Sequence, residues 1–254
     1  MLGASGTYPT AGQACSGYLL QAAGLRVWVD AGAGTLANLM HHITPPELDA
    51  IWVSHLHADH ASDLALAGHA LCFGHEPARS PIPVLGPPGL REYVHALLPA
   101  GVPGVPEQAF DLHEVHDGER FELDGLTLES VAVEHAMPAF GLRVTIAPAS
   151  PGAGPVVFAY SGDTGPTASL TRLAADADLF LCEASWTAQP DGVPPIHLTA
   201  EQAGHCAAAA GARRLVLTHL RPDSDPAAAA EAAARTFGGP VEIATQGAEL
   251  AFGT

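Results

Sequence analysis

Four side chains of the kinds that bind divalent metal ions lie within six residues of one another. They are His55, His57, Asp59 and His60, and they follow directly after the apolar run 51–53. Neutral imidazole nitrogens and carboxylate oxygens are the ligands that zinc and similar divalent ions prefer. Without a metal, several of these polar atoms would compete for few partners, which is costly in a protein interior. The pattern His-x-His-x-Asp-His therefore predicts a metal site.

The order of these four residues indicates two metal positions rather than one. His55 and His57 alternate along an extended loop, so their rings are expected to point the same way. Asp59 and His60 are expected to face a second position. Two-metal hydrolases hold their ions about 3.5–4 Å apart through a bridging group, so roughly three further ligands are needed from elsewhere in the chain.

Candidates for the missing ligands lie at the ends of apolar, β-rich runs. These runs cover residues 25–29, 51–53, 126–133, 156–160, 179–182 and 215–218. The polar residues at or just beyond their ends are Asp30, His55, His135, Asp163, Glu183 and His219. In a layered α/β fold, side chains at strand ends converge on one rim, where ligands usually bind. We therefore expect His135, Asp163 and His219 to complete the two metal sites.

Helical patterns separate these predicted strands. Apolar spacing and capping residues predict helices over 62–73, 90–98, 203–210 and 227–237. Pro/Gly-rich segments at 77–89, 99–106 and 148–155 are interpreted as loops within one domain that spans residues 1–254, because no charge shift or low-complexity linker accompanies them. The Gly-rich stretch after Asp30 partly matches a dinucleotide fingerprint, but a tight turn beside the metal site is the favoured interpretation.

The composition excludes several classes of function. The formal net charge is -17, and all ten cationic side chains are arginine. A protein that grips a nucleic-acid backbone needs a basic stripe, and this chain has none. The absence of lysine excludes Schiff-base chemistry and a phosphate-binding P-loop. Scattered cysteines, and the lack of an apolar run long enough for a membrane span or of a visible signal peptide, favour a cytoplasmic protein.

Over almost its full length the chain resembles the metallo-β-lactamase-fold hydrolases. Among them it is most similar to the ribonuclease Z-like branch, including the actinobacterial cyclic-nucleotide phosphodiesterases. The matching motifs are Gly3-Ala-Ser-Gly-Thr, Asp30-Ala-Gly, Ser54-His-Leu-His-Ala-Asp-His, Tyr160-Ser-Gly-Asp-Thr-Gly, Cys182-Glu-Ala-Ser-Trp, His197-Leu-Thr-Ala-Glu-Gln-Ala-Gly and Leu217-Thr-His-Leu. The resemblance implies an α/β fold, a four-layer αββα sandwich built from two similar halves.

The resemblance also implies a role for each site residue. One metal would be held by His55, His57 and His135, the other by Asp59, His60 and His219, and Asp163 would bridge them. Glu183 and His197 would form a proton-handling pair. The expected catalytic residues are therefore Asp59, Glu183 and His197, and the expected cofactors are two divalent ions, with zinc preferred over manganese or iron.

These expectations lead to a phosphodiesterase that acts on small substrates. Two divalent ions carry four positive charges, and the two aspartates carry only two negative charges. The net positive charge that remains at the site suits a phosphodiester. The preference for 3′,5′-cyclic nucleotides depends on the resemblance alone. Metal coordination would bring the pKa of a water toward about 7, and His197, oriented by Glu183, would protonate the leaving ribose oxygen.

Three alternatives remain at this point. The first is transfer-RNA 3′ processing. The lack of a basic exosite arm argues against it. The second is a lactone or thioester hydrolase, which would make less use of the Glu183–His197 pair. The third is a metal-stabilised binding module without catalysis. The expected partner is a small phosphodiester rather than nucleic acid or a membrane, with a homodimer expected from the family.

Overall fold

Two mixed β-sheets form the centre of the molecule. The computed structural model describes residues 1–98, 104–148, 150 and 152–253. Within them, the first sheet has the strand order β1-β2-β3-β4-β5, and the second has the order β12-β11-β10-β9-β8-β7-β6. The strands of the first sheet are β1 (Tyr18–Ala22), β2 (Leu25–Val29), β3 (Ala50–Trp52), β4 (Ile82–Gly86) and β5 (Phe110–Glu114). Those of the second are β6 (Arg120–Leu123), β7 (Leu126–Ala132), β8 (Phe140–Ile146), β9 (Val156–Tyr160), β10 (Leu179–Glu183), β11 (Leu215–Thr218) and β12 (Val241–Ile243).

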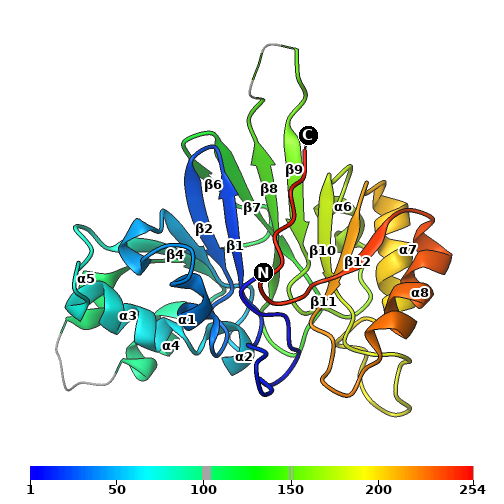
Figure 1. Ribbon diagram of the computed structural model, residues 1–254, viewed down its shortest axis with the longest axis horizontal. Helices are drawn as coiled ribbons and strands as arrows, with labels where there is room; N and C mark the ends of the chain where they lie inside the picture. Colours follow the sequence, from blue (N-terminus) through cyan, green and yellow to red (C-terminus); the bar gives the residue numbers. More distant parts are fainter. Residues whose placement is uncertain (99–103, 149, 151, 254) are drawn as a thin grey trace.

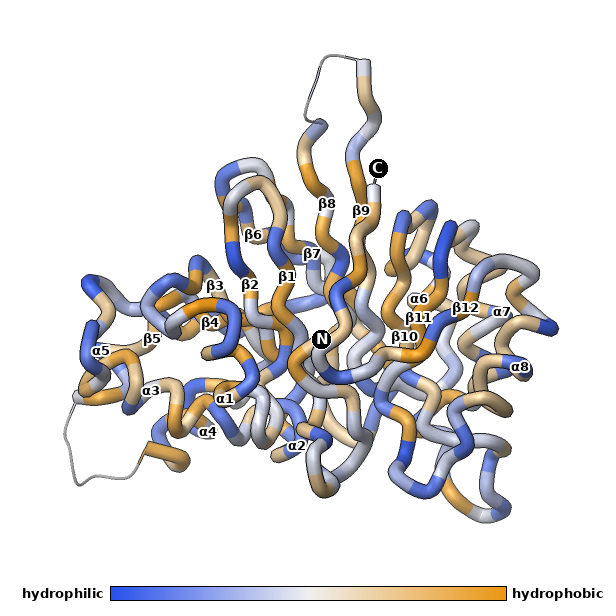
Figure 2. Tube along the Cα trace, in the orientation of Figure 1, coloured by the Kyte–Doolittle hydropathy of each residue, from blue (hydrophilic) through white to orange (hydrophobic). Residues whose placement is uncertain are grey.

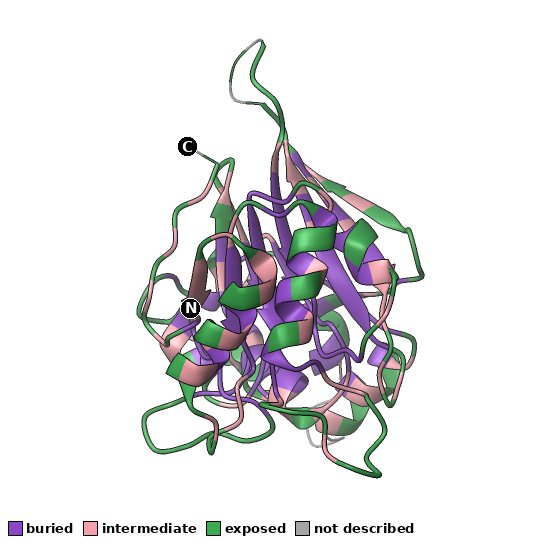
Figure 3. Cartoon of the chain, turned by 90° about the vertical axis from the view of Figure 1, so that its right-hand side faces the viewer, coloured by how far each residue is buried: buried purple, intermediate pink, exposed green. Residues whose placement is uncertain are grey.

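Helices cover the outer face of each sheet. The first sheet carries α1 (Thr35–Leu39), η1 (Pro45–Glu47), α2 (Ala58–Ala61), α3 (Leu64–Phe73), α4 (Leu90–Leu97) and α5 (Val105–Ala109). The second carries α6 (Ser169–Leu173), α7 (Ala200–Ala210) and α8 (Pro226–Phe237). Figure 1 shows the two helical layers on opposite sides of the paired sheets, and Figure 3 shows the buried strands behind the half-exposed helices of the second half. The predicted four-layer αββα sandwich is confirmed.

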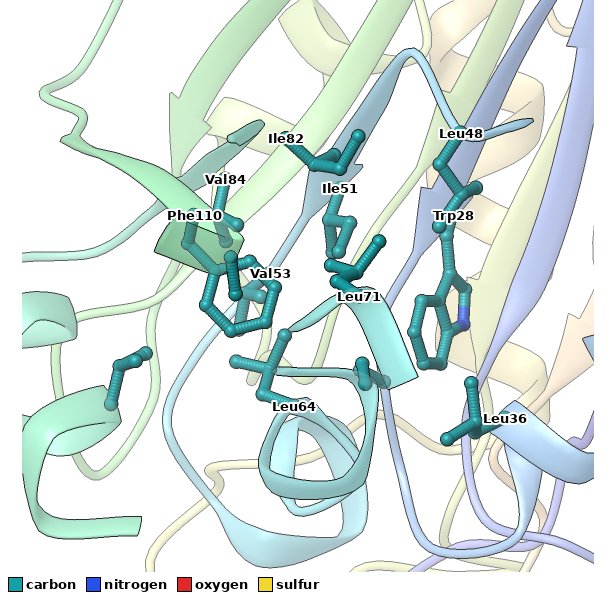
Figure 4. Close-up of a cluster of buried hydrophobic side chains, with 14 of the residues drawn as sticks. Trp28, Leu36, Leu48, Ile51, Val53, Leu64, Leu71, Ile82, Val84 and Phe110 are labelled. Carbon is teal, nitrogen blue, oxygen red and sulfur yellow. The ribbon is translucent and has the colours of Figure 1, made fainter. Parts of the chain in front are cut away.

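Three clusters of apolar side chains hold these layers together. One lies between the first sheet and its helices, where Trp28, Ile51 and Val84 meet Leu64 and Leu71 of α3 (Figure 4). A second fills the space between the two sheets, and a third lies between the second sheet and its helices. Figure 2 shows the apolar residues concentrated along the central strands. Burial of apolar surface at about 25 cal/mol per Å² is what binds such layers to each other.

The strand directions bring distant segments to one edge of the sandwich. The pairs β2–β3 and β3–β4 are parallel in the first sheet, as are β9–β10 and β10–β11 in the second. Carboxyl ends of parallel neighbours lie on the same edge of a sheet, where open α/β folds place their ligands. The segments that follow β3, β9, β10 and β11 are therefore close together, near α2 at the lower edge in Figure 1.

Two buried phenols connect the sheets across the central core. Tyr18 of the first sheet lies 2.6 Å from the Thr218 hydroxyl of the second. In the opposite direction, the Tyr160 hydroxyl of the second sheet donates to Asp30 at 2.7 Å. The two rings pack edge to face with centroids 5.2 Å apart. Burial raises the pKa of both tyrosines, so each remains a neutral hydroxyl. These contacts fix the position of one sheet relative to the other.

Comparison with the predicted elements shows where sequence patterns were incomplete. The six predicted strands are present, and α4, α7 and α8 begin and end near the predicted bounds. The segment 77–89 is not only a loop, because β4 lies inside it, and α5 begins within 99–106, of which residues 99–103 lie outside the described part of the chain. The helix predicted over 62–73 starts instead at Leu64, because the Asp63 amide donates to the Ala31 carbonyl and not to the preceding turn.

Candidate metal centre

Three histidine nitrogens and one carboxylate converge at the edge where the two sheets meet. The Nε2 atom of His55 lies 3.0 Å from Nδ1 of His57, and Nε2 of His135 lies 3.2 Å from the same atom. A carboxylate oxygen of Asp163 lies 3.7 Å from Nε2 of His55. One donor atom from each of these four residues falls within 4.8 Å of all the others. This arrangement is suited to one divalent ion.

A second group of four lies beside the first. The Nε2 atom of His219 lies 3.2 Å from Asp59 and 3.4 Å from Asp163, and Nε2 of His60 lies 3.3 Å from the other oxygen of Asp163. These four residues also place one donor atom each within 4.8 Å of the others. Asp163 belongs to both groups. The structure thus brings together all seven of the residues that the sequence singled out as metal ligands.

Local backbone conformation explains how these side chains reach one point. The chain leaves β3 in an extended conformation through His57, which is the N-cap residue of the short helix α2 that carries Asp59 and His60. On the other sheet, Gly162 has φ 60°, and a Cβ there would lie 3.0 Å from the Cβ of Ser54. His219 itself has φ 55°, a left-handed conformation that a residue with a side chain seldom adopts. Such strain is concentrated at functional sites.

Hydrogen bonds behind the site fix which ring nitrogen faces inward. The Ser54 hydroxyl donates to Asp30, so it accepts from Nδ1 of His55 at 3.0 Å. The ring of His135 donates from Nδ1 to the Ile196 carbonyl at 3.0 Å. These assignments follow from the hydrogen-bond partners rather than from visible protons. Both rings are thereby left with an unprotonated Nε2 that points into the first group, as metal ligation requires.

The same arrangement holds the histidines of the second group. Nδ1 of His60 donates to Asp30 at 2.7 Å. Nδ1 of His219 lies 2.8 Å from the Ser185 hydroxyl, which in turn donates to Glu183 at 2.8 Å. In each case the opposite nitrogen, Nε2, faces the shared carboxylate of Asp163. Outer partners of this kind orient metal-binding imidazoles and raise their basicity.

Burial and charge set the protonation states. Burial lowers the pKa of His55 well below its usual value and also lowers those of His57 and His135, so these rings are neutral and offer a lone pair. Burial alone would raise the pKa of Asp163, but the charges of His219 and His60 hold it well below its usual range. The first group is thus neutral imidazole around an ionised carboxylate, the donor set that zinc binds.

Two unpaired polar atoms indicate that the residues fit a metal. His60 Nε2 and Asp163 Oδ1 are buried and lie 3.3 Å apart, but neither makes a hydrogen bond of acceptable geometry with any described residue. Burying unpaired polar groups is costly, and native proteins rarely do so without a reason. Burial lowers the pKa of His60, but the charges of Asp163 and Asp30 raise it well above its usual value. The electrostatic potential around His60 is therefore negative. A divalent cation held by these two residues would satisfy both atoms.

Asp30 holds the outer side of the second group. Its buried carboxylate accepts hydrogen bonds from the Ser54 amide, the Ser54 hydroxyl, the His60 ring and the Tyr160 hydroxyl, at 2.7–2.8 Å. Asp30 has φ 57° in the Gly-rich turn after β2. In that turn a Cβ on Gly32 would lie 2.0 Å from the Asp59 carbonyl oxygen. The Gly-rich turn therefore packs beside the site. This agrees with the sequence analysis, which favoured a tight turn over a dinucleotide-binding site.

Replacement of Asp30 tests this support. We expect Asp30→Asn to weaken metal affinity by about 10–100-fold, because an outer partner of a ligand histidine is lost. The amide would also direct an N–H toward donors that now bind a carboxylate. Metal affinity would be measured by competition with a chromophoric chelator. Tyr160→Phe is the matched control, since it removes only one of the four donors. Equal affinities of Asp30→Asn and the wild type would contradict this role.

A separate ion pair lies next to both groups. The Oε1 atom of the buried Glu183 lies 2.8 Å from Nδ1 of His197, and the Glu183 carboxylate also accepts from the Thr164 amide and from Ser185. Burial lowers the pKa of His197, but the hydrogen bond and charge of Glu183 raise it to about 8. His197 is therefore protonated at neutral pH. The same nitrogen lies 3.8 Å from Asp163, so this acid stands at the edge of the metal groups.

Some contributors to the site were not identified from the sequence. Ser54 and Ser185 lie within two of the matching motifs, but their roles depend on contacts across the fold that the sequence does not show. Thr7 is another: it has φ 71°, and its amide donates to Asp59 Oδ2 at 2.9 Å. The loop that carries it fits against His219 because Gly6 has no side chain, and a Cβ there would lie 2.5 Å from the His219 carbonyl. In the sequence, the motif at residues 3–7 was the feature that could have indicated a role for this loop in the site.

Comparisons with known proteins agree with this geometry. The Beta-lactamase superfamily domain matches residues 25–220. An uncharacterized protein of Mycobacterium tuberculosis is 35% identical, covering 95% of this chain and 87% of that protein. Ribonuclease Z of Myxococcus xanthus is 30% identical, with coverage of 97% and 94%. The crystal structure of the metallo-beta-lactamase fold protein YhfI from Bacillus subtilis superposes with a TM-score of 0.83 at 26% identity, covering 97% of this chain and 95% of that one.

Proposed function

Because the chain belongs to the beta-lactamase superfamily, whose relatives here are metal-dependent hydrolases, we propose that it hydrolyses phosphodiester bonds in small substrates, with 3′,5′-cyclic nucleotides favoured. The observation that carries the proposal is the position of the Glu183–His197 pair beside two four-residue metal groups. Phosphodiester cleavage expels an alkoxide, which needs a proton, and a protonated imidazole is placed to supply one. The hydrolase class follows from the family, and the substrate is our inference.

We assign the metal ligands as the two groups divide them. His55, His57 and His135 would hold one divalent ion, Asp59, His60 and His219 would hold the other, and Asp163 would be shared. Bound there, two such ions would neutralise charge on the phosphoryl oxygens and lower the pKa of a water molecule toward about 7. Zinc is the favoured ion for this donor set, with manganese or iron as alternatives.

The remaining chemistry belongs to residues of the chain. Nδ1 of His197 is bonded to Glu183, so its proton for the leaving ribose oxygen must come from Nε2. Glu183 keeps the ring oriented and stabilises its charged form, while its second oxygen accepts from Ser185. Asp59, whose carboxylate accepts from the Thr7 amide, would be held in place by that bond while it serves the second metal. Each group is thus positioned before substrate arrives.

The net charge supports a small substrate over a transfer RNA. At -17 the chain would repel a long polyanion, whereas a cyclic nucleotide presents one charge to the metal site alone. Relatives named ribonuclease Z keep transfer-RNA processing as the second candidate. Binding of an RNA through many phosphates weakens steeply with salt.

A substrate screen tests the proposal. Purified, metal-reconstituted protein would be assayed with cyclic AMP, cyclic GMP, precursor transfer RNA and a lactone panel, at 50 and 200 mM salt. We expect turnover of the cyclic nucleotides with little response to salt. An RNA held by 6–10 phosphates would lose about 10³–10⁵-fold in affinity over that range. Cleavage of the RNA or of lactones without cleavage of the cyclic nucleotides would refute the proposal.

A further inference from the structure

An arginine and a tryptophan stack on each other beside the proposed proton donor. The guanidinium carbon of Arg221 lies 4.9 Å from the centroid of the Trp186 ring. The Trp186 ring meets that of His197 edge to face, with centroids 6.2 Å apart. Both residues come from segments that build the site, since Trp186 is three residues beyond Glu183 and Arg221 is two beyond His219. Neither has a role in the chemistry described above.

The backbone holds this pair firmly at the rim. The Trp186 amide donates to the Leu198 carbonyl at 3.1 Å, directly after His197. The Leu220 carbonyl accepts from the Gly6 amide at 3.0 Å, so the segment that carries Arg221 is joined to the loop that carries Thr7. These bonds hold the backbone of both segments beside the acid and the metal groups, and the stack on Trp186 then places the guanidinium next to His197.

One edge of the Arg221 guanidinium is left without a protein partner. Its face is covered by Trp186, and its Nε atom bonds to Asp223 at 3.2 Å. Within the described residues, the terminal nitrogens Nη1 and Nη2 make no hydrogen bond, and the side chain is 32% exposed. Other arginines are engaged away from the site, as in the ion pairs Arg26–Glu47, Arg120–Glu129, Arg172–Asp117 and Arg214–Glu242. A planar fork of two donors is therefore left free for a ligand on a half-exposed side chain that stacks on Trp186, next to His197.

The surroundings of this fork favour a neutral ligand with two acceptors. Asp223 offsets part of the guanidinium charge, and the metal groups already provide for the anionic phosphate of a nucleotide. What remains of a cyclic nucleotide is its ribose and base. Guanine presents O6 and N7 as adjacent acceptors, and the pairing of arginine with these two atoms is the commonest specific contact between a side chain and a base. Adenine offers N7 next to an amino donor, which the fork would repel.

We propose that Arg221, held flat by Trp186, is a specificity-determining residue that binds the O6/N7 edge of a guanine base in the substrate. The inference depends on the proposed cyclic-nucleotide hydrolysis and adds a preference for cyclic GMP over cyclic AMP. A structural role alone, as a stack at the surface, would contribute to stability without distinguishing one base from the other.

The test compares three substrates on one set of variants. The ratio of kcat/KM for cyclic GMP to that for cyclic AMP would be measured for the wild type, Arg221→Met and Arg221→Lys. Cyclic IMP is the third substrate, because hypoxanthine keeps O6 and N7 but lacks the 2-amino group. Arg120→Met is the matched control. Arg120 also forms an ion pair, with Glu129 on the neighbouring strand, but it belongs to neither metal group. Melting temperatures would be recorded for every variant.

We expect Arg221→Met to lower the cyclic GMP to cyclic AMP ratio by roughly 5- to 150-fold, the range for one bidentate base contact. Arg221→Lys should restore little of it, because an ammonium lacks the planar fork. Cyclic IMP should behave like cyclic GMP. A ratio unchanged in Arg221→Met, or cyclic IMP behaving like cyclic AMP, would overturn the inference while leaving the proposed function intact. If the wild type turns over none of the three, the proposed function fails and the inference fails with it.

Discussion

His197→Ala is expected to lower kcat on 3′,5′-cyclic AMP by about 10²–10⁴-fold, the usual contribution of a positioned general acid. The effect should almost vanish with bis-p-nitrophenyl phosphate, because p-nitrophenolate departs without a proton. This difference arises from where His197 lies: Nδ1 is bonded to Glu183, and the ring is protonated at neutral pH with a pKa of about 8. Initial rates on the two substrates at pH 7, each at saturating concentration, are the measurement.

The control for this variant is His205→Ala. His205 is an exposed histidine on α7, and its loss should leave both rates unchanged. Metal content must be measured in parallel, since Glu183, His197 and His219 also place donor atoms within 4.8 Å of one another. Equal losses on the two phosphodiesters, accompanied by lost metal, would make His197 a ligand rather than an acid.

Asp163→Ala is expected to reduce kcat/KM by more than about 10³-fold and to remove metal from both positions. Loss of an outer partner alone typically costs 10–100-fold in affinity, and Asp163 is a direct contributor to both groups. Its removal would also leave His60, His219 and His55 without the carboxylate that now lies 3.3–3.7 Å from each. Metal per chain would be measured by elemental analysis after gel filtration.

Thermal unfolding gives an independent readout for the same variant. A ligand that binds only the native state raises stability by RT ln(1 + [L]/Kd), so added zinc should raise the Tm of the wild type but not that of Asp163→Ala. Asp111→Ala, an exposed aspartate that pairs with His113, is the matched control and should respond as the wild type does. Retention of two ions per chain by Asp163→Ala would refute its assignment as the shared ligand.

The convergence of the seven candidate ligands could be predicted from the sequence because it depends on local patterns. Four of the seven lie in one cluster, and the other three follow apolar runs that form β7, β9 and β11. A strand end is a strong constraint on position, because parallel strands of one layered fold finish at a common edge. The apolar residues 51–53, directly before the cluster, gave the remaining signal.

Other parts of the site and fold depend on contacts that no local pattern records. The four bonds of Asp30 involve residues 54, 60 and 160, so its role as an outer support is visible only in three dimensions. Pro/Gly-rich composition concealed β4, in which Pro83 lies near the start of the strand, before the pairing with β3 begins at Val84. The break between α2 and α3 lies where the Asp63 amide donates to the carbonyl of Ala31, a residue of another segment.

The reciprocal tyrosine bonds between the sheets affect how far the candidate metal ligands can move relative to one another. His55, His57, Asp59 and His60 follow a strand of one sheet, and His135, Asp163 and His219 follow strands of the other. Any shift of one sheet against the other would therefore separate the ligands into two incomplete halves. The contacts of Tyr18 and Tyr160 oppose that shift, although neither residue belongs to the metal groups. A substitution in the interior that altered the spacing of the two sheets would therefore change the distances among the candidate ligands without replacing any of them.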